Sequence, residues 1–336
     1  MQHRTQRGAA LLTAMVIVTL VATLAGSMVW QQWRAVQVEA AERARVQSQW
    51  ILDGAIDWAR LILREDARTG GVDHLGEPWA LPLAEAKLST FLAADRENTD
   101  DAPDAFLSGV ITDAQSRFNL RNLVEPGANS TAEAQALAEL FELAGASADA
   151  AARVVAGLRD AAPARAPVTD GNAGTGTKTE TGTTAPQTAR SADPPLMPER
   201  IDQLAWLGLD AETLQRITPY VTLLPVRTPI NANTASKEVL AAVIPGMDLA
   251  GAERLVQLRQ RNPLRQLTEI TNLLPQAQRK NVDQGTVDFK SRYFVVRGRL
   301  RLQDRVVEER ALVERRQLEI VLLRRERVTA LDSVAQ

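Results

Sequence analysis

Apolar residues occupy the start of the chain almost without interruption. From Ala9 to Trp30, 17 of 22 positions are apolar and none is charged. A helix needs about 20 such residues to cross a bilayer, so the segment predicts one membrane span. Arg4 and Arg7 precede this span, and the next charged residue is Arg34. This charge distribution predicts a cytoplasmic N-terminus and export of the rest of the chain.

The pattern then becomes amphipathic without a break. Residues 31–68 contain no proline, and apolar side chains recur every three or four positions from Trp50 to Leu63. This spacing indicates a helix with one buried face, on which we expect Trp50 and Trp58 as core contacts. Thr69 and the two glycines after it end the helix. One helix of roughly 90 Å is therefore predicted from Ala9 to Arg68.

Alternating patterns near the C-terminus predict an antiparallel sheet. In residues 291–302 apolar and basic side chains alternate, and residues 306–314 and 318–324 form two further strands after short turns. Strand 318–324 is expected to bury Leu318, Ile320 and Leu322 on one face. An earlier strand is predicted at 109–113. These strands and the long helix predict an α+β fold.

The region between the strands has mostly helical patterns. Helices are expected within 134–158, 201–207 and 211–220, and a helix, a Pro-Gly turn and a second helix fall within 230–270. Residues 163–198 differ, because 25 of the 36 are Gly, Thr, Ala, Pro or Ser. Such a segment buries too little apolar surface to offset its ordering entropy, so we predict a disordered low-complexity linker.

Composition excludes several classes of chemistry. The chain has no cysteine and two histidines, which removes disulfides, thiolate metal sites and cysteine nucleophiles and leaves almost no histidine chemistry. The net charge of −2 is not the basic surplus usual for proteins that live on nucleic acid. Residues 290–327 nevertheless carry 12 basic and 6 acidic side chains. That surplus indicates either a solvated strand face or a contact with an acidic partner.

The N-terminal border of the span is distinctive. Arg7 and Gly8 are followed at once by the apolar run, which begins at Ala9. This border resembles the class III signal of type IV pilins and pseudopilins. The resemblance implies cleavage by a prepilin peptidase between Gly8 and Ala9 and N-methylation of Ala9, with residues 1–8 as a cytoplasmic leader. A cleaved secretory signal and a plain membrane anchor are the alternatives.

One position departs from the pilin pattern. Most pilin-like proteins carry glutamate at the fifth mature position, where it attracts the N-terminal amine of the neighbouring subunit; here that position is Thr13. An unpaired carboxylate inside a bilayer is costly. A subunit at the tip of a filament has no such neighbour ahead of it and would tolerate the loss. In a plain anchor, Thr13 is simply a helix residue.

A second motif indicates a particular family. The strand at 109–113 runs into D-A-Q-S-R-F-N-L-R-N-L at residues 113–123. This motif closely resembles the general secretion pathway protein K family (GspK), the large minor pseudopilin of type II secretion systems, and the segments 74–79 and 291–299 resemble it too. Ser116 stands where the family has glycine. The resemblance implies a pilin-like long helix on an antiparallel sheet, with a large, mostly helical inserted domain.

The same resemblance implies a non-enzymatic role at the tip of a periplasmic pseudopilus. Its partners would be other minor pseudopilins, the major pseudopilin, the inner-membrane secretion platform and the prepilin peptidase, with one span in the inner membrane and the C-terminal domain in the periplasm. The expected parts are a leader (1–8), a transmembrane helix (9–30), its periplasmic continuation (31–68), a pilin-like domain (69–124 and 286–327) and a helical insertion (125–285).

No catalytic, metal-binding or DNA-binding residue is assigned. Family members have calcium sites in the inserted domain, but here the corresponding acidic stretch is replaced by residues 158–163 and the linker, so we assign no ligand and no cofactor. Residues 230–270 resemble a helix-hairpin-helix module that binds DNA through hairpin amides. Asp248 at the turn would repel phosphate, and Asn233 or Thr234 is expected to be a helix N-cap. A membrane-anchored competence-type DNA receptor and a type IV pilus minor pilin are the alternative functions.

Overall fold

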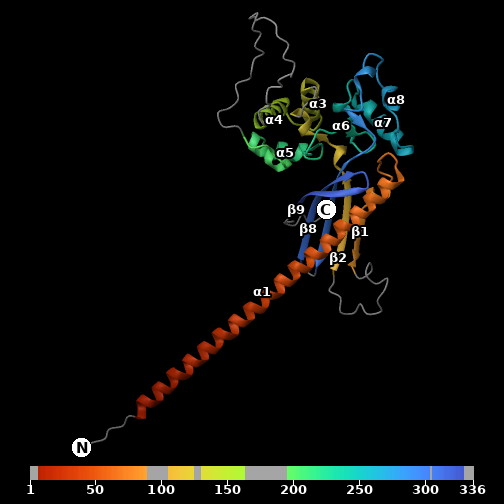
Figure 1. Cartoon of the computed structure of the whole chain (residues 1–336). Helices are drawn as coiled ribbons and strands as arrows, with labels where there is room; N and C mark the ends of the chain where they lie inside the picture. Colours follow the sequence, from red (N-terminus) through yellow and green to blue (C-terminus); the bar gives the residue numbers. More distant parts are fainter. Residues whose placement is uncertain (1–6, 89–104, 125–129, 163–194, 303–304, 329–336) are drawn as a thin grey trace, which may run out of the picture.

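The computed structural model describes residues 7–88, 105–124, 130–162, 195–302 and 305–328. Its most prominent element is α1, Arg7–Thr69, a helix of 63 residues. The N-terminal half of α1 projects away from the head, and the C-terminal half lies along the sheet (Figure 1). Gly70, with φ +66°, follows the last turn. The prediction of one long helix ending at the Thr-Gly-Gly segment is confirmed.

The C-terminal half of α1 buries one narrow stripe. Leu52, Ile56, Ala59 and Leu63 are buried at spacings of four, three and four residues, which keeps them on one face of a helix. The prediction that Trp50 and Trp58 are core contacts is wrong, because they are 74% and 50% exposed. Trp50 lies two residues from the buried Leu52, on the opposite side of the helix.

The sheet has five antiparallel strands in the order β1-β2-β7-β8-β9. Their bounds are β1 Leu83–Lys87, β2 Ala105–Asp113, β7 Tyr293–Leu302, β8 Arg305–Arg316 and β9 Glu319–Val328. The α+β prediction is confirmed, and so is the meander of the last three strands. Of the three residues expected to be buried, only Ile320 is; Leu322 of β9 is 40% exposed, and Leu318, which precedes β9, is 50% exposed. β9 is the edge strand of the sheet, and a register shift leaves its Leu323 without a paired residue on β8.

Helix and sheet approach closely where two glycines face each other. Gly109 of β2 and Gly298 of β7 are directly paired across the strands. A methyl group placed on Gly298 would lie 3.3 Å from Cδ2 of Leu52 on α1. The missing side chain therefore lets α1 lie against β7.

The chain between β2 and β7 forms a helical insertion at the end of the sheet distant from the projecting half of α1 (Figure 1). Its longer elements are α3 Ser130–Leu143, α4 Ala148–Ala161, η4 Ile201–Leu207, α5 Ala211–Ile217, α6 Lys237–Val243, α7 Leu249–Arg261 and α8 Leu267–Thr271. The helical pattern at 134–158 is two helices, because the chain turns at Gly145 with φ +73°. The insertion has its own buried core, into which Phe118, Leu120 and Leu123 also pack.

Short elements connect the insertion to the sheet. They are η2 Ala114–Ser116, η3 Leu120–Leu123, η5 Arg279–Asn281, and the parallel pairs β3 Phe118–Asn119 with β4 Val221–Thr222 and β5 Ile230–Asn231 with β6 Val287–Asp288. A further short helix, η1 Pro78–Ala80, lies between α1 and β1 and packs Trp79 against both α1 and the sheet. Most of the predicted linker (163–194) and the first six residues of the predicted leader lie outside the described residues.

Candidate functional site

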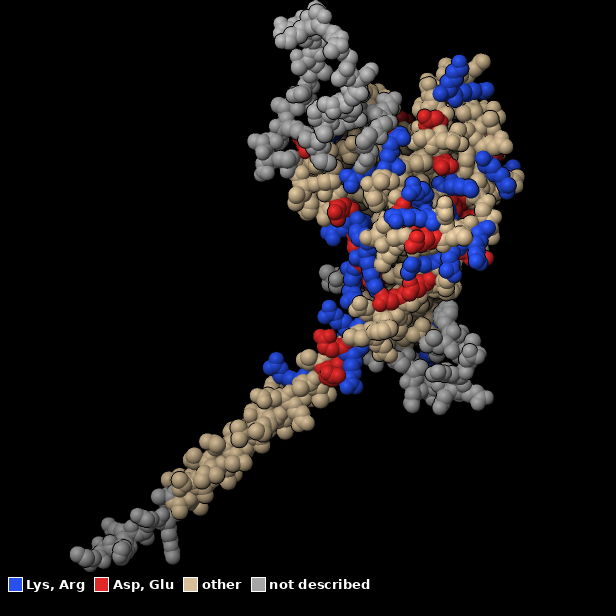
Figure 2. Space-filling model, in the orientation of Figure 1, with Lys and Arg blue, Asp and Glu red and all other residues tan. Residues whose placement is uncertain are grey.

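The projecting half of α1 is the first functional surface. It contains a stretch long and apolar enough to cross a membrane, none of which is buried against the rest of the chain. The hydroxyls of Thr19, Thr23 and Ser27 each donate to a backbone carbonyl three or four residues earlier, at 2.8 to 3.0 Å. Figure 2 shows this half as an uncharged rod. A helix whose polar groups are all satisfied internally suits a lipid or apolar protein environment.

The second candidate is a buried polar cluster at the end of β2, which we call the polar junction: Asp113, Asn231, Thr234 and Ser291. One carboxylate oxygen of Asp113, Oδ2, accepts hydrogen bonds from the hydroxyls of Thr234 and Ser291, both at 2.6 Å, and from Nδ2 of Asn231 at 3.0 Å. The other oxygen accepts from the backbone amide of Gln115 at 2.7 Å. The junction therefore joins the sheet, the insertion and the chain returning to β7.

Burial dominates the electrostatics of the junction. Desolvation raises the pKa of Asp113 to about 6, although the hydrogen bonds from Ser291, Thr234 and Gln115 lower it. Asp113 is only 4% exposed, so the arrangement serves to hold these segments together.

The family motif at 113–123 extends the same role. The Asn119 amide donates to the Val226 carbonyl (2.8 Å) and to the Thr228 hydroxyl (3.0 Å). The Asn122 side chain accepts from the Thr228 backbone amide (3.1 Å) and donates to its carbonyl (2.9 Å). Buried backbone groups of a segment without regular structure need such partners. The polar residues of the motif thus satisfy the backbone of the insertion.

The module at 230–270 uses its motif residues in packing. Asn233 is not a helix N-cap: its amide pairs with the Leu264 backbone, accepting at 2.8 Å and donating at 3.0 Å. Thr234 is engaged with Asp113. Ser236 is the N-cap of α6, accepting from the Val239 amide. The expectation that Asn233 or Thr234 caps this helix is therefore wrong, because tertiary contacts take both side chains.

The hairpin turn of the module is covered. Gly246 has φ +80°, and a methyl group placed there would meet the Gln278 side chain at 2.5 Å. Asp248 caps α7, accepting from the Gly251 amide at 2.7 Å. Arg259 donates to the Ala232 carbonyl inside the module. A DNA-binding hairpin presents bare amides to phosphate, and this turn presents a side chain and a carboxylate instead.

Three carboxylates cluster beside the polar junction, where the Ser291 amide donates to Asp73. Oxygens of Asp66, Asp73 and Glu77 lie within 4.8 Å of one another, as metal ligands can. The Arg315 guanidinium donates to Asp66 at 2.7 Å and to Asp73 at 2.6 Å. Glu77 accepts from the Trp79 indole at 2.7 Å and from the His74 amide at 2.9 Å. The chain's own arginine thus supplies the positive charge that a metal ion would otherwise bring.

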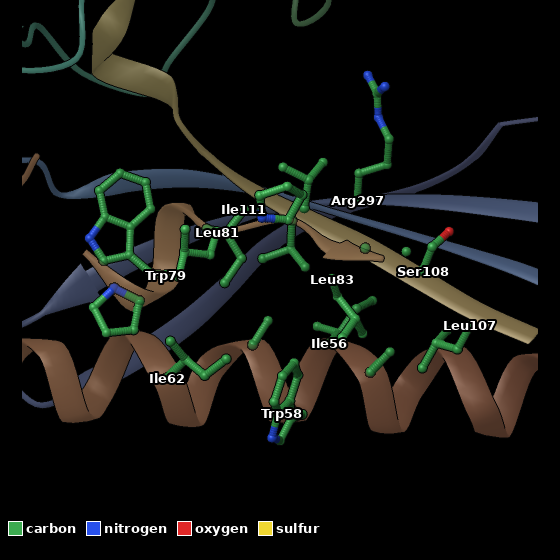
Figure 3. Close-up of a pocket in the computed structure, with 18 residues that line it drawn as sticks. Ile56, Trp58, Ile62, Trp79, Leu81, Leu83, Leu107, Ser108, Ile111 and Arg297 are labelled. Carbon is green, nitrogen blue, oxygen red and sulfur yellow. The ribbon is translucent and has the colours of Figure 1, made fainter. Parts of the chain in front are cut away.

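An apolar groove of about 250 Å³ lies between α1 and the first two strands. Figure 3 shows α1 along one side, Ile56 and Leu83 in the middle and Trp79 at one end. Of the residues that line it, only Ser108 and Arg297 are polar. The groove holds no pair of groups for acid–base or nucleophilic chemistry.

Comparisons with known proteins bear on the family. Two family models described as "Type II secretion system (T2SS), protein K" match residues 116–226 and 230–290. Type II secretion system protein K of Pseudomonas aeruginosa is 29% identical over 316 residues, which are 90% of this chain and 87% of the relative. The Klebsiella pneumoniae protein of the same name is 30% identical over 271 residues, 77% of this chain and 76% of the relative. The chain belongs to the type II secretion system protein K family.

The fold agrees with this assignment. A chain in the crystal structure of the GspK-GspI-GspJ complex from enterotoxigenic Escherichia coli superposes with a TM-score of 0.63 at 19% identity. The match covers 86% of this chain and 99% of that one. The family indicated by the motif at 113–123 is therefore confirmed, and the chain is a minor pseudopilin of a type II secretion system.

The residues predicted for processing lie at one end of the molecule. Gly8 and Ala9 are in the first turn of α1, at the end of the helix that projects away from the head (Figure 1). Their cleavage and methylation stay predictions. Sequence reasoning missed the roles of Ser291 and Arg315, which contact Asp113 and Asp73 only after the sheet has formed. Arg315 is one of four arginines in β8, and its sequence neighbours do not distinguish it from the others.

Proposed function

We propose that this minor pseudopilin caps the tip of a periplasmic pseudopilus. Its α1 has the single exposed apolar half that a filament subunit inserts among its neighbours. The observation that carries the proposal is the place of the insertion, at the end of the sheet opposite to that half (Figure 1). A bulky domain there obstructs the next subunit of a growing filament. Thr13 supports the same position, because it brings no carboxylate that would need a neighbour's amine.

The membrane arrangement follows from α1 and its flanking charges. We propose one span at residues 9–30 in the inner membrane, with residues 1–8 in the cytoplasm and the head in the periplasm. Arg4 and Arg7 before the span support this orientation. A prepilin peptidase would cut after Gly8, and Ala9 would become the methylated N-terminus.

The proposed parts are a membrane helix, a pilin-like head and a helical insertion. The head comprises residues 69–124 and 286–327, and the insertion comprises 125–285. The separate buried core of the insertion supports the division. The proposed role is mechanical and non-enzymatic, since the groove, the polar junction and the carboxylate cluster are all occupied by structural contacts or lined by apolar groups.

The partners proposed are the other minor pseudopilins. The related structure is a complex of GspK with GspI and GspJ, and we extend that association to this chain. The major pseudopilin and the inner-membrane platform would meet its apolar helix during assembly.

Mass spectrometry of the mature N-terminus tests the leader. The wild-type chain should begin at Ala9 with a methyl group, and Gly8→Val should retain residues 1–8. Gly26→Val is a matched control. Gly26 lies in the same helix, and a Cβ placed on it has no atom within 4 Å, so this variant should be processed normally. An Ala9 terminus in the Gly8 variant refutes the class III signal.

Co-purification tests the filament assignment. Full-length chain extracted in detergent should carry type II minor pseudopilins with it, whereas type IV pilus minor pilins would support the alternative filament. In a filament preparation, labelled antibody against the insertion should mark one end only. Labelling along the whole length would refute the tip position.

A further inference from the structure

One face of the sheet carries a concentration of arginines. In β7 the buried inner residues alternate with outward Arg297, Arg299 and Arg301, as the pleat of a strand requires. Arg297 is directly paired with Arg310 of β8. We define the arginine face as Arg117, Arg297, Arg299 and Arg310.

Arg117 lies outside the sheet, directly after η2 at the end of β2, and we include it because the charges of Arg310 and Arg297 act on its guanidinium. Its pKa is lowered first by burial and then by the charges of Arg310 and Arg297. Arg117 and Arg310 are both only partly exposed to solvent. The like charges therefore lie within electrostatic reach of one another, with water screening them incompletely.

Acidic side chains on the same side of the sheet neutralise only some of the arginines. Glu308 pairs with Arg297 at 3.2 Å. At the margins, Arg301 pairs with Glu85 at 2.7 Å and Arg324 pairs with Glu326 at 2.8 Å.

Arg299 and Arg310 each have a glutamate directly opposite on the neighbouring strand, Glu308 and Glu326, but these glutamates form their salt bridges with Arg297 and Arg324. Arg117, Arg299 and Arg310 have no ion pair with any residue that the structure describes. Nε of Arg310 is buried and has no hydrogen-bond partner there either.

This arrangement lowers stability and therefore needs another explanation. Like charges placed opposite one another across strands are destabilising, and a buried donor without an acceptor adds a desolvation penalty. Guanidinium groups that form no salt bridge within the chain can, however, pair with carboxylates of another molecule. We propose that the arginine face binds the acidic surface of a neighbouring folded protein, whose carboxylates pair with Arg117, Arg299 and Arg310.

The distance between the arginine face and the membrane argues against lipid headgroups as the anionic ligand. Val296 packs with Ile56 of α1, and 26 residues of helix separate Ile56 from Trp30 at the end of the predicted span. At 1.5 Å per residue that is about 40 Å, several times the Debye length of roughly 8 Å at physiological salt. Anionic headgroups lie too far away to neutralise these arginines.

Fluorescence anisotropy with a labelled polyglutamate peptide tests the proposal on the full chain in detergent micelles. Binding should be saturable and should weaken steeply with salt. The double variant Arg299→Gln/Arg310→Gln should bind about tenfold more weakly, as expected for the loss of two charge-assisted contacts. The control Arg254→Gln/Arg261→Gln removes the same charge from exposed positions of α7 and should bind as the wild type does. Equal losses in both variants would overturn the proposal.

Two other occupants give different results in the same assay. Duplex DNA or anionic vesicles could bind more tightly than polyglutamate and lose the same affinity in the Arg299→Gln/Arg310→Gln variant. That result would identify nucleic acid or lipid, and not an acidic protein, as the ligand and would overturn the proposal. The chain's own acidic segment, with Asp95, Glu97, Asp100, Asp101 and Asp104, is the other occupant. Neutralising those five residues would then increase polyglutamate binding, and that increase would also overturn the proposal.

Thermal unfolding checks the energetic premise. Arg310→Gln should leave the melting temperature unchanged or raise it, because it removes a repelling and incompletely solvated charge. A lower melting temperature would show that Arg310 stabilises the sheet and would refute the premise. Neither measurement requires a filament, so failure here leaves the proposed tip position intact.

Discussion

Removal of the Asp113 carboxylate should uncouple the insertion from the sheet. In Asp113→Ala the Gln115 amide loses its only acceptor in the junction, and Thr234 and Ser291 lose theirs at 2.6 Å. A hydrogen bond to a charged group contributes about 1.5–3 kcal/mol. The substitution also removes the desolvation penalty of the buried carboxylate, which offsets part of the loss of these three hydrogen bonds. We expect the free energy of unfolding to fall by about 3–5 kcal/mol, because each buried donor left without an acceptor costs about 1–3 kcal/mol.

Urea unfolding followed by tryptophan fluorescence measures this loss, and hydrogen exchange locates it. Exchange should accelerate in 230–236 and around Ser291, which the carboxylate joins. Asp210→Ala is a suitable control, because Asp210 is an exposed N-cap of α5 that accepts from Thr213 at 2.8 Å. Losing a cap costs about 1 kcal/mol. If Asp113→Ala costs no more than Asp210→Ala, the polar junction does not hold the two parts together.

Three further predictions concern pH, the buried arginine and the exposed tryptophan. The pKa of Asp113 is raised to about 6 from 3.8, so between these values the folded state holds a proton that the unfolded state has lost. Stability should therefore decrease as pH rises from about 4 to about 6, by up to about 3 kcal/mol, and then level off. Burial also raises the pKa of Asp66 to about 6, so Asp113→Asn should remove only the Asp113 share of this slope in urea titrations at a series of pH values, and an unchanged slope would assign all of it to other groups. Arg315→Met should cost about 3–5 kcal/mol in urea unfolding, because it leaves buried Asp73 unpaired and also frees Asp66. A loss below 1 kcal/mol would mean that the carboxylates find another cation. Trp50→Ala should change stability by less than about 0.5 kcal/mol, whereas Leu63→Ala should cost about 2–5 kcal/mol, since Trp50 is 74% exposed and Leu63 is fully buried. Comparable losses in thermal unfolding would contradict the packing of α1.

Local sequence patterns predicted the elements that form from short-range physics. The apolar run, the missing prolines and the Thr-Gly-Gly end determine α1. Alternation in β7 predicted correctly which side chains face the helix, because a pleated strand has only two faces. Alternation failed for Leu322, which is 40% exposed on the edge strand β9.

The sequence identified the motif residues but did not predict which distant residues they contact. The D-A-Q-x-R-F-N-L motif identified the family, yet sequence spacing could not show that Asp113 meets Thr234 and Ser291, which lie 121 and 178 residues later. The N-cap assignment of Asn233 or Thr234 failed for a related reason. A local cap is a small stabilisation, and a buried tertiary hydrogen bond to Asp113 or Leu264 outweighed it.

The sequence by itself determined a membrane helix, a strand meander, a helical insertion and the family. Those features rest on hydrophobic period, helix-ending residues and short motifs, all of which act over a few neighbouring residues. Only the tertiary structure decided which face of α1 is buried, that Arg315 occupies the carboxylate cluster, and that Arg117, Arg299 and Arg310 form no salt bridge with the residues described. Those features depend on which distant residues are brought into contact, because burial and electrostatic energy are set by neighbours in space.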